Sequence, residues 1–146
     1  MNDKAADELA IRNLVARYSD AVNRRDAGAW GATWADNGEW LLMGQSTRGR
    51  DNIVAFWEKL MQGFPFVMQL VHSGTVEVDG DRGLGRLYLT EISKSPDGTA
   101  GSSVGVYHDR FVREQGEWRF AQRQFNLLYM GPPDLSGQLI PFPSDV

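Results

Sequence analysis

The first 25 residues carry an apolar stripe with helical spacing. Its members fall at intervals of i, i+3, i+4, i+7 and i+11, which places them on one side of a helix. They are Ile11, Leu14, Val15, Tyr18 and Val22. We therefore predict a helix from Asp3 to Arg25 with this side buried. Tyr18 lies in the middle of the stripe, so its ring faces the core and its hydroxyl needs a hydrogen-bond partner.

Three shorter elements follow. The pattern favours a short helix from Ala27 to Ala35 and a strand from Asn37 to Met43. A third helix is expected from Ile53 to Met61, where apolar residues again recur at helical spacing. The segment Arg50-Asp51-Asn52 precedes it and offers an N-cap.

After Pro65 the chain changes to strand-like runs separated by turn residues such as Asp79-Gly80 and Gln115-Gly116. The runs are Phe66–Val78, Leu84–Ser95, Ser102–Arg113 and Glu117–Met130. Short turns between consecutive strands predict an antiparallel sheet. Apolar residues occur at both odd and even positions of these strands, and therefore on both faces of the sheet. We expect helices to cover one face and a partner subunit the other.

These elements predict one α+β domain over residues 1–146, in which the N-terminal helices pack on a strongly curved antiparallel sheet. A curved sheet with helices on its concave side leaves a cone-shaped pocket, the usual place for a small ligand. Residues 131–146 form a proline-rich tail that still contains Leu139, Ile140 and Phe142. We expect this tail to cover the pocket.

Composition narrows the function. With 15 basic and 19 acidic residues the net charge is −4, and no basic cluster occurs, so nucleic acid and anionic membranes are not expected partners. The absence of cysteine excludes disulfides and thiolate chemistry. The N-terminus does not resemble a signal sequence and no apolar run reaches membrane-spanning length, which predicts a cytoplasmic protein. Cofactor and metal motifs are missing, so we expect neither a cofactor nor a metal.

His72 is the first candidate for chemistry, because it is one of two histidines and lies in a strand-like apolar run. Strand alternation predicts that Phe66, Met68, Leu70, Val76 and Val78 share its face. An imidazole on an apolar face can accept a proton near neutral pH. The alternative is a core histidine with one satisfied hydrogen bond.

Four further residues each have a chemical and a structural interpretation. Tyr18 either donates a hydrogen bond to an oxyanion or fills the core. Glu91 shares parity with two leucines, so it is either a buried carboxyl with a raised pKa or an edge residue in solvent. Arg123 either stabilises an anion or forms a cross-strand ion pair. His108 either takes part in the chemistry directly or makes structural hydrogen bonds, and we expect the second.

The chain resembles the SnoaL-like branch of the nuclear-transport-factor-2-like superfamily, whose fold is also called cystatin-like. The segments that carry the resemblance are Tyr18–Asp26, Trp34–Trp40, His72, Val106–Phe111 and Gly116–Phe120. The superfamily includes ketosteroid isomerase, scytalone dehydratase, hexachlorocyclohexane dehydrochlorinase and bacterial bile-acid dehydratase. The resemblance is nearest to the dehydrochlorinase and to scytalone dehydratase, and it implies either dimers or trimers.

In these two enzymes the histidine that matches His72 is the general base, and a carboxylate from the first helix holds it. Asn23 stands at the position of that carboxylate, so the resemblance implies that Asn23 orients the imidazole without stabilising its charge. It also implies that Tyr18 binds an oxyanion, that Arg123 is a pocket arginine, and that Glu91 lies close to the acidic residue of the bile-acid dehydratase. Leu42 replaces the base of the isomerase.

Together these observations predict a cofactor-independent lyase acting on a hydrophobic cyclic or aromatic small molecule, with His72 as base. Water, halide or a small carbonyl would be released. An isomerase, a polyketide-type cyclase and a non-catalytic binder are the alternatives. We expect a homo-oligomer, a trimer rather than a dimer. The expected substrate-binding residues are Val22, Trp40, Leu42, Phe56, Met68, Leu70, Tyr107, Phe125 and Phe142.

Overall fold

The computed structural model describes residues 3–143. The first helix, α1 (Lys4–Arg24), begins where the Asp3 carboxylate accepts hydrogen bonds from the backbone amides of Ala5 and Ala6. It ends at Arg25, which takes the left-handed conformation with φ of 55°. The predicted helix and its buried stripe are confirmed.

Two shorter helices follow, α2 (Ala27–Gly31) and α3 (Arg50–Gln62). The structure ends α2 four residues earlier than predicted, because the next strand already begins at Trp34. Helix α3 starts earlier than predicted, and Gly49 with φ of 87° is its N-cap. The expected caps at Arg50, Asp51 and Asn52 lie inside the helix instead.

The strands form a single curved sheet in the order β2-β1-β6-β5-β4-β3, with β7 paired to β6. Their bounds are β1 (Trp34–Leu42), β2 (Gln45–Arg48), β3 (Phe66–Asp79), β4 (Arg82–Lys94), β5 (Ala100–Glu114), β6 (Glu117–Gly131) and β7 (Gln138–Leu139). The four long strands confirm the predicted runs. The sheet is mixed rather than wholly antiparallel, because β1 runs parallel to β6. No hairpin joins these two strands, so no short turn forces them to run in opposite directions.

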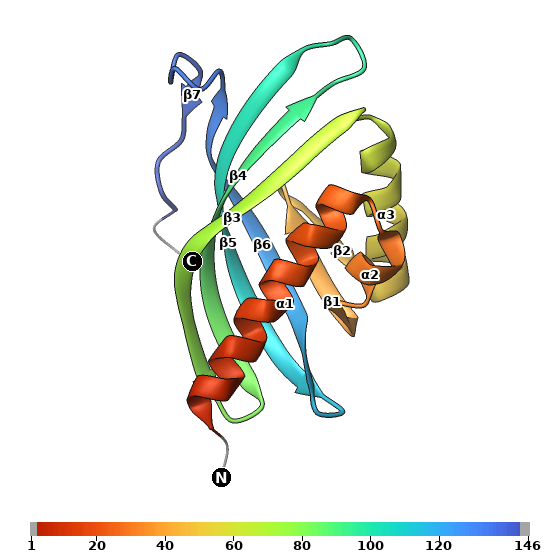
Figure 1. Ribbon diagram of the computed structural model, residues 1–146, viewed down its shortest axis with the longest axis vertical. Helices are drawn as coiled ribbons and strands as arrows, with labels where there is room; N and C mark the ends of the chain where they lie inside the picture. Colours follow the sequence, from red (N-terminus) through yellow and green to blue (C-terminus); the bar gives the residue numbers. More distant parts are fainter. Residues whose placement is uncertain (1–2, 144–146) are drawn as a thin grey trace.

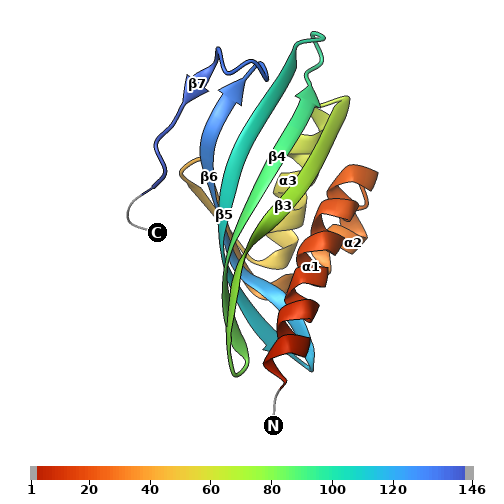
Figure 2. The same ribbon diagram turned by 60° about the vertical axis from the view of Figure 1, so that its left-hand side comes forward.

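The helices lie on the concave side of the sheet, with α1 alongside β3 (Figure 1). Seen from the side, β7 and the segment after it lie on the opposite, outer side (Figure 2). The α+β class with helices on a curved sheet is thereby confirmed. Among the helices of the described chain, none is long and apolar enough to span a membrane.

Aromatic rings fill the core where α2 and α3 pack on β1. Trp30 is fully buried and stacks on Trp57 at a centroid distance of 4.7 Å, while Trp34 and Trp40 meet it edge-on. These rings connect α2 and α3 with β1. They make a rigid wall beside the space that α1 and the sheet leave open.

Candidate active site

A β-bulge in β3 decides which side chains reach the concave side of the sheet. The register of β3 against β4 shifts between Val71 and Gly74. At Gly74 a side chain would collide with the carbonyl oxygen of Arg86, so only glycine fits this close approach. The bulge reverses the alternation. Odd-numbered residues such as Val67 face the concave side before it, and even-numbered ones such as Val76 face it afterwards.

His72 therefore lies on the outer face, where its side chain is exposed and its Nε2 is 2.8 Å from Thr90 Oγ1. The prediction that it shares a face with Val76 and Val78 is wrong, because the bulge separates them. Phe66 and Leu70 do share its face, but that face is the exposed one. His72 is not among the side chains that line the pocket on the concave side.

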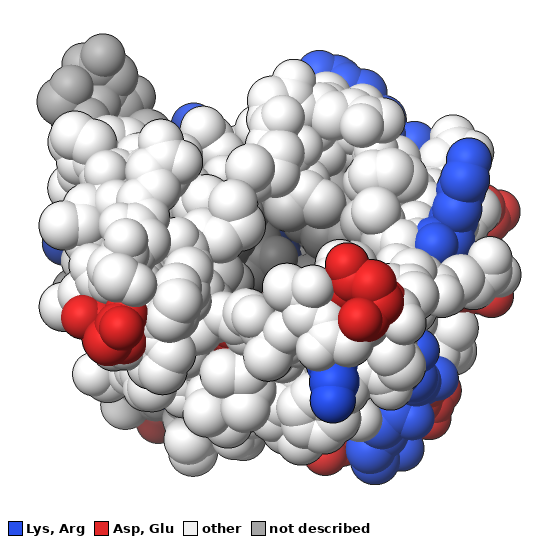
Figure 3. Space-filling view, turned by 90° about the horizontal axis from the view of Figure 1, so that it is seen from above, with Lys and Arg blue, Asp and Glu red and all other residues white. Residues whose placement is uncertain are grey.

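That pocket has a volume of about 320 Å³ and opens between the β1–β2 turn, the end of α3 and the start of β3. Seen from this end, the molecule is hollowed and mostly uncharged residues surround the opening (Figure 3). Its lining combines a few polar groups with apolar side chains from α1, α3 and five strands. The lining residues are Tyr18, Val22, Trp40, Leu42, Met43, Trp57, Leu60, Met61, Phe64, Val67, Gln69, Leu89, Glu91, Ser103, Tyr107, Phe125, Leu127 and Met130.

Glu91 is the only Asp, Glu, Lys, Arg or His in this lining. It faces Gln69 across the β3–β4 pair and Ser103 across the β4–β5 pair. Its Oε2 accepts a hydrogen bond of 3.3 Å from the Gln69 amide. Burial raises the pKa of Glu91 above its ordinary value, and the bond from Gln69 opposes this shift. The structure thus supports the raised-pKa interpretation of Glu91 over the edge position in solvent.

Two phenols stand deeper in the pocket. The hydroxyl of Tyr18, from α1, lies 3.5 Å from that of Tyr107, from β5. Burial is the main cause that raises the pKa of both groups, so they are protonated at neutral pH. One shared hydrogen bond uses one of the two hydroxyl hydrogens, which leaves the other for a ligand acceptor.

Arg123 does not line the pocket but lies beneath these phenols. Its Nε and Nη2 donate to the carboxylate of Asp109 at 2.7 and 2.9 Å. Its Cζ lies 3.7 Å from the ring centroid of Tyr107 and 4.4 Å from that of Tyr18. Of the two interpretations of Arg123, the cross-strand ion pair is the one that the structure shows. A substrate anion cannot reach this guanidinium without displacing a phenol.

Asn23 does not contact His72. Its Nδ2 donates to the carbonyl oxygen of Gln69 at 2.9 Å, and its Oδ1 accepts from the Gln69 backbone amide at 2.7 Å. The expectation that Asn23 orients the imidazole is therefore wrong. It holds the strand position that faces Glu91.

The expected substrate-binding residues divide into two groups. Five line the pocket, namely Val22, Trp40, Leu42, Tyr107 and Phe125. Phe56 packs behind Trp40 at a centroid distance of 5.7 Å, and Met68 shares the outer face of β3 with Leu70. Phe56, Met68 and Leu70 do not line this pocket, because the bulge and the second turn of α3 direct their side chains elsewhere.

Phe142 is also misplaced by the sequence prediction. Its ring lies on the outer face against Tyr88 and His108, at centroid distances of 6.5 and 6.0 Å. In the described part of the tail, residues 132–143, no side chain lines the pocket. The tail pairs with β6 through β7 and covers the convex side. His108 beneath it receives a hydrogen bond of 2.9 Å between its Nδ1 and Asn126 Nδ2, in line with a structural role.

Sequence reasoning missed Gln69 and Ser103. Both are polar residues opposite Glu91 on neighbouring strands, so correct strand pairing would have found them. The glycine that signals the bulge, Gly74, was available in the sequence. It was the one cue that would have placed Gln69 inside and His72 outside.

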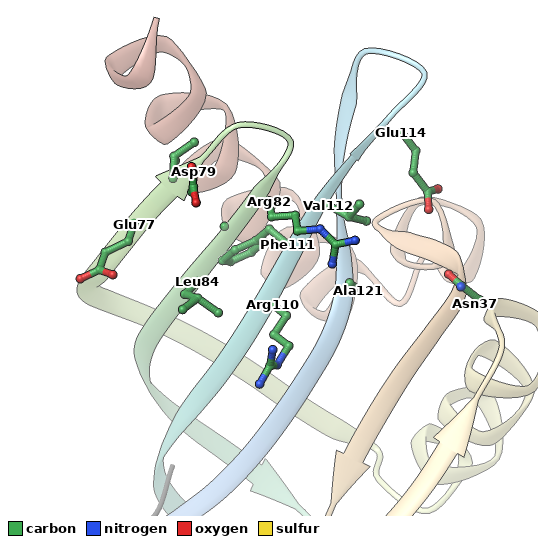
Figure 4. A pocket seen from close by; sticks show the side chains of 12 residues that line it. Asn37, Glu77, Asp79, Arg82, Leu84, Arg110, Phe111, Val112, Glu114 and Ala121 are labelled. Carbon is green, nitrogen blue, oxygen red and sulfur yellow. The ribbon is translucent and has the colours of Figure 1, made fainter. Parts of the chain in front are cut away.

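A larger hollow of about 600 Å³ lies near the β3–β4 hairpin (Figure 4). Arg82 and Arg110 project into it, while Glu77, Asp79 and Glu114 stand around it. This hollow is more polar and lacks buried titratable groups. Neither arginine forms a salt bridge within residues 3–143. We therefore place the candidate site in the smaller, apolar pocket. No group of three potential metal ligands occurs within the described residues.

An apolar cone with a carboxylate and two phenols at its interior defines a small-molecule site on an α+β scaffold. A family model described as the SnoaL-like domain matches residues 3–124. The chain belongs to this family, as its resemblance indicated.

Among curated proteins, the gamma-hexachlorocyclohexane dehydrochlorinase of Sphingobium indicum is 25% identical over 138 residues, covering 89% of this chain and 86% of that protein. A hexachlorocyclohexane dehydrochlorinase of Novosphingobium barchaimii has the same fold, with a TM-score of 0.82, 20% identity and coverage of 95% and 97% of the two chains. A protein of unknown function with a cystatin-like fold from Nostoc punctiforme gives a TM-score of 0.76 at 20% identity, covering 93% and 98%. The family and the curated relative support an enzyme with lyase-type or related activity.

Proposed function

We propose that the protein is a cofactor-independent lyase that acts on a hydrophobic cyclic or aromatic small molecule, with Glu91 as its general base. The observation that carries this proposal is the position of Glu91. It is the one ionisable side chain, phenols apart, in an apolar pocket, and burial raises its pKa. A carboxylate in such surroundings is a stronger base than one in water.

The reaction begins when the Glu91 carboxylate takes a proton from a substrate carbon. The electron pair of that C–H bond forms the new double bond, and the neighbouring bond to the leaving group breaks. A halide leaves as the anion while the proton stays on Glu91, and a hydroxyl leaves as water by accepting that same proton from Glu91. A well-placed base contributes about 10²–10⁴ in rate.

The two phenols supply the second part of the site. A substrate oxygen within reach of Tyr18 and Tyr107 accepts a hydrogen bond from the free hydroxyl hydrogen. Negative charge that develops there is stabilised by a neutral donor among mostly apolar side chains. Arg123 below the rings is paired with Asp109, so it supports the phenols from behind without touching the substrate.

Pocket size and lining limit the substrate. Small-molecule pockets span roughly 300–1,000 Å³, and this one, at about 320 Å³, is at the lower end. Trp40, Trp57 and Phe125 offer flat aromatic surfaces. A compact ring compound fits better than an extended chain or a highly charged metabolite.

A second candidate is an isomerase or cyclase. The observation that favours it is the pairing of a single carboxylate with two phenols in one pocket. A carboxylate that removes a proton can return it to another carbon of the same intermediate, while the phenols hold the enolate oxygen. The product would then have the mass of the substrate.

The test uses γ-hexachlorocyclohexane, the compound named for the curated relative, together with a panel of cyclic and aryl alcohols and ketones. Product mass and chloride release are measured for the wild type, Glu91→Gln and the matched control His72→Ala. We expect Glu91→Gln to lose about 10²-fold or more in turnover and His72→Ala to keep it. Loss in His72→Ala with retention in Glu91→Gln would overturn the proposal.

Ligand binding is measured separately through the fluorescence of the pocket residues Trp40 and Trp57. A binding protein would show quenching by panel compounds, with the same affinity in Glu91→Gln and no product from any variant. That result would replace the lyase by a non-catalytic binder.

We further propose that the protein assembles as a homo-oligomer, a trimer in keeping with its resemblance. The support is the outer face of β3 and β4, where Phe66, Leu70 and Ile92 are 40–47% exposed. Sedimentation equilibrium at low micromolar concentration measures the assembly. A folded monomer under these conditions would contradict the proposal.

A further inference from the structure

Asn23 and Gln69 form a two-way pair that only an amide can make. The side chain of Asn23 presents a donor to the Gln69 carbonyl oxygen at 2.9 Å and an acceptor to the Gln69 backbone N–H at 2.7 Å. It thereby bonds the peptide groups of β3 as a neighbouring strand would. A carboxylate would place an oxygen against the carbonyl oxygen and lose one of the two bonds.

The Gln69 side chain is fixed in turn. Ser19, one helical turn before Asn23 on α1, donates from its Oγ to Gln69 Oε1 at 3.0 Å. With its oxygen engaged, the amide directs Nε2 toward Glu91, whose Oε2 accepts at 3.3 Å. Gln69 is 5% exposed, so little room remains for another rotamer.

We propose that Asn23 and Gln69 are positioning residues, which transmit the placement of α1 through β3 to the Glu91 carboxylate and hold it toward the substrate. Only the consequence for turnover rests on the proposed function of Glu91. The geometry leaves Glu91 Oε1 without a hydrogen bond to any described residue, so this oxygen is free to accept a substrate proton.

This relay, the hydrogen bonds that run from Asn23 and Ser19 through Gln69 to Glu91, contains no charge other than that of Glu91. The titratable groups that face the same pocket are Tyr18 on α1 and Tyr107 on β5, both neutral at ordinary pH. Helix α3 contributes apolar side chains, among them Trp57 and Met61. The Gln69 amide is thus the one group that draws the pKa of Glu91 down against burial.

The experiment follows the Glu91 carboxyl by ¹³C NMR titration of the substrate-free protein. Removing the amide in Gln69→Leu withdraws a hydrogen bond from the charged form, so the pKa of Glu91 should rise by about half a unit to one unit. The matched control is Gln122→Leu. Gln122 donates to Glu39 at 2.7 Å outside the pocket, so this variant should shift Glu39 and leave Glu91 unchanged.

Ser19→Ala is the second variant, in case Gln69→Leu does not fold. It removes the bond that orients the Gln69 amide but leaves the packing of the pocket in place, and we expect a smaller shift of Glu91 in the same direction. A Glu91 titration that moves no further in the Gln69 and Ser19 variants than in Gln122→Leu would overturn the proposal.

Turnover separates this inference from the proposed function. If Glu91 is the base, the acidic limb of the pH–rate profile should move upward in Gln69→Leu together with the NMR titration. An NMR shift in a protein whose turnover survives Glu91→Gln would keep the relay and reject Glu91 as base. Asn23→Asp should lower kcat more than it raises KM, because it disturbs position rather than substrate contact.

Discussion

Arg123 and Asp109 are cross-strand partners on β6 and β5, and their side chains form an ion pair of 2.7 Å that is almost completely hidden from solvent. Three aromatic rings, those of Tyr18, Tyr107 and Phe120, lie within 4.4 Å of the guanidinium carbon. The pair satisfies both charges internally and forms the floor below the phenols. Its expected role is therefore to hold the site together rather than to bind substrate.

Removing one member of this pair should destabilise the fold strongly. Arg123→Met leaves the Asp109 carboxylate buried and unpaired, which costs about 3–5 kcal/mol in the free energy of unfolding. Urea denaturation of Arg123→Met, Asp109→Leu and the double variant measures the coupling. We expect the double variant to be far more stable than the sum of the single changes predicts. Additive losses would show that the two side chains do not depend on each other.

The sequence predicted the elements of the fold well, because apolar periodicity is a local signal. The stripe of α1 and the alternation of β4 to β6 appear in the residues themselves. Apolar periodicity could not predict that β1 pairs in parallel with β6, since this pairing joins segments some 80 residues apart. No short turn connects β1 with β6, so the sequence carries no local signal for their relative direction.

The site was predicted in part. Tyr18 lies on a regular helix and Glu91 on a strand without a bulge at that point, so the apolar pattern around each one shows which way it faces. Both line the pocket. His72 does not, because the bulge ending at Gly74 adds one residue to β3 and turns every earlier side chain to the other face. The resemblance placed Asn23 where related enzymes have a carboxylate that holds the histidine. In the structure Asn23 instead bonds the backbone amide and carbonyl of Gln69 on β3.

Glu91 should lower the stability of the free protein at neutral pH. Its pKa is raised in the folded state by burial, so its contribution to stability is present below the ordinary carboxyl pKa and lost as pH rises through the folded-state pKa. Glu91→Gln should therefore melt about 2–4 °C higher than wild type at pH 8. The difference should vanish below about pH 4.5.

Glu39→Gln serves as the comparison for this experiment. Hydrogen bonds from Ser46 and Gln122 lower the pKa of Glu39, so its carboxylate stabilises the fold at neutral pH. Differential scanning calorimetry across pH 4 to 8 should thus give shifts of opposite sign for the two variants. A lower melting temperature for Glu91→Gln at pH 8 would contradict the raised pKa.

The phenols of Tyr18 and Tyr107 should act as one donor. Because their hydroxyls lie 3.5 Å apart and share a hydrogen bond, one hydrogen remains for the substrate. Tyr18→Phe and Tyr107→Phe should each lower kcat by about 10²-fold, because one variant loses the hydroxyl that donates to the oxyanion and the other loses the hydroxyl that orients it. The double variant should be little worse than either single one.

Steady-state kinetics at saturating substrate measures these variants, with Tyr88→Phe as control because Tyr88 lies on the outer face against Phe142. Independent donors would give multiplied losses of about 10⁴-fold in the double variant. That outcome would show that each hydroxyl contacts the substrate separately.

Two phenylalanines test where the ligand binds. Phe125 lines the pocket and packs on Tyr107 at a centroid distance of 5.3 Å, whereas Phe142 lies in the tail on the convex side. Phe125→Ala should weaken ligand binding about 10-fold or more, because it removes aromatic surface worth roughly 1.5–3 kcal/mol from the pocket wall. Phe142→Ala should leave the affinity unchanged. Titration of the tryptophan fluorescence with a ring compound that quenches the wild type measures both, and a loss of affinity in Phe142→Ala would mean that the tail closes over the pocket.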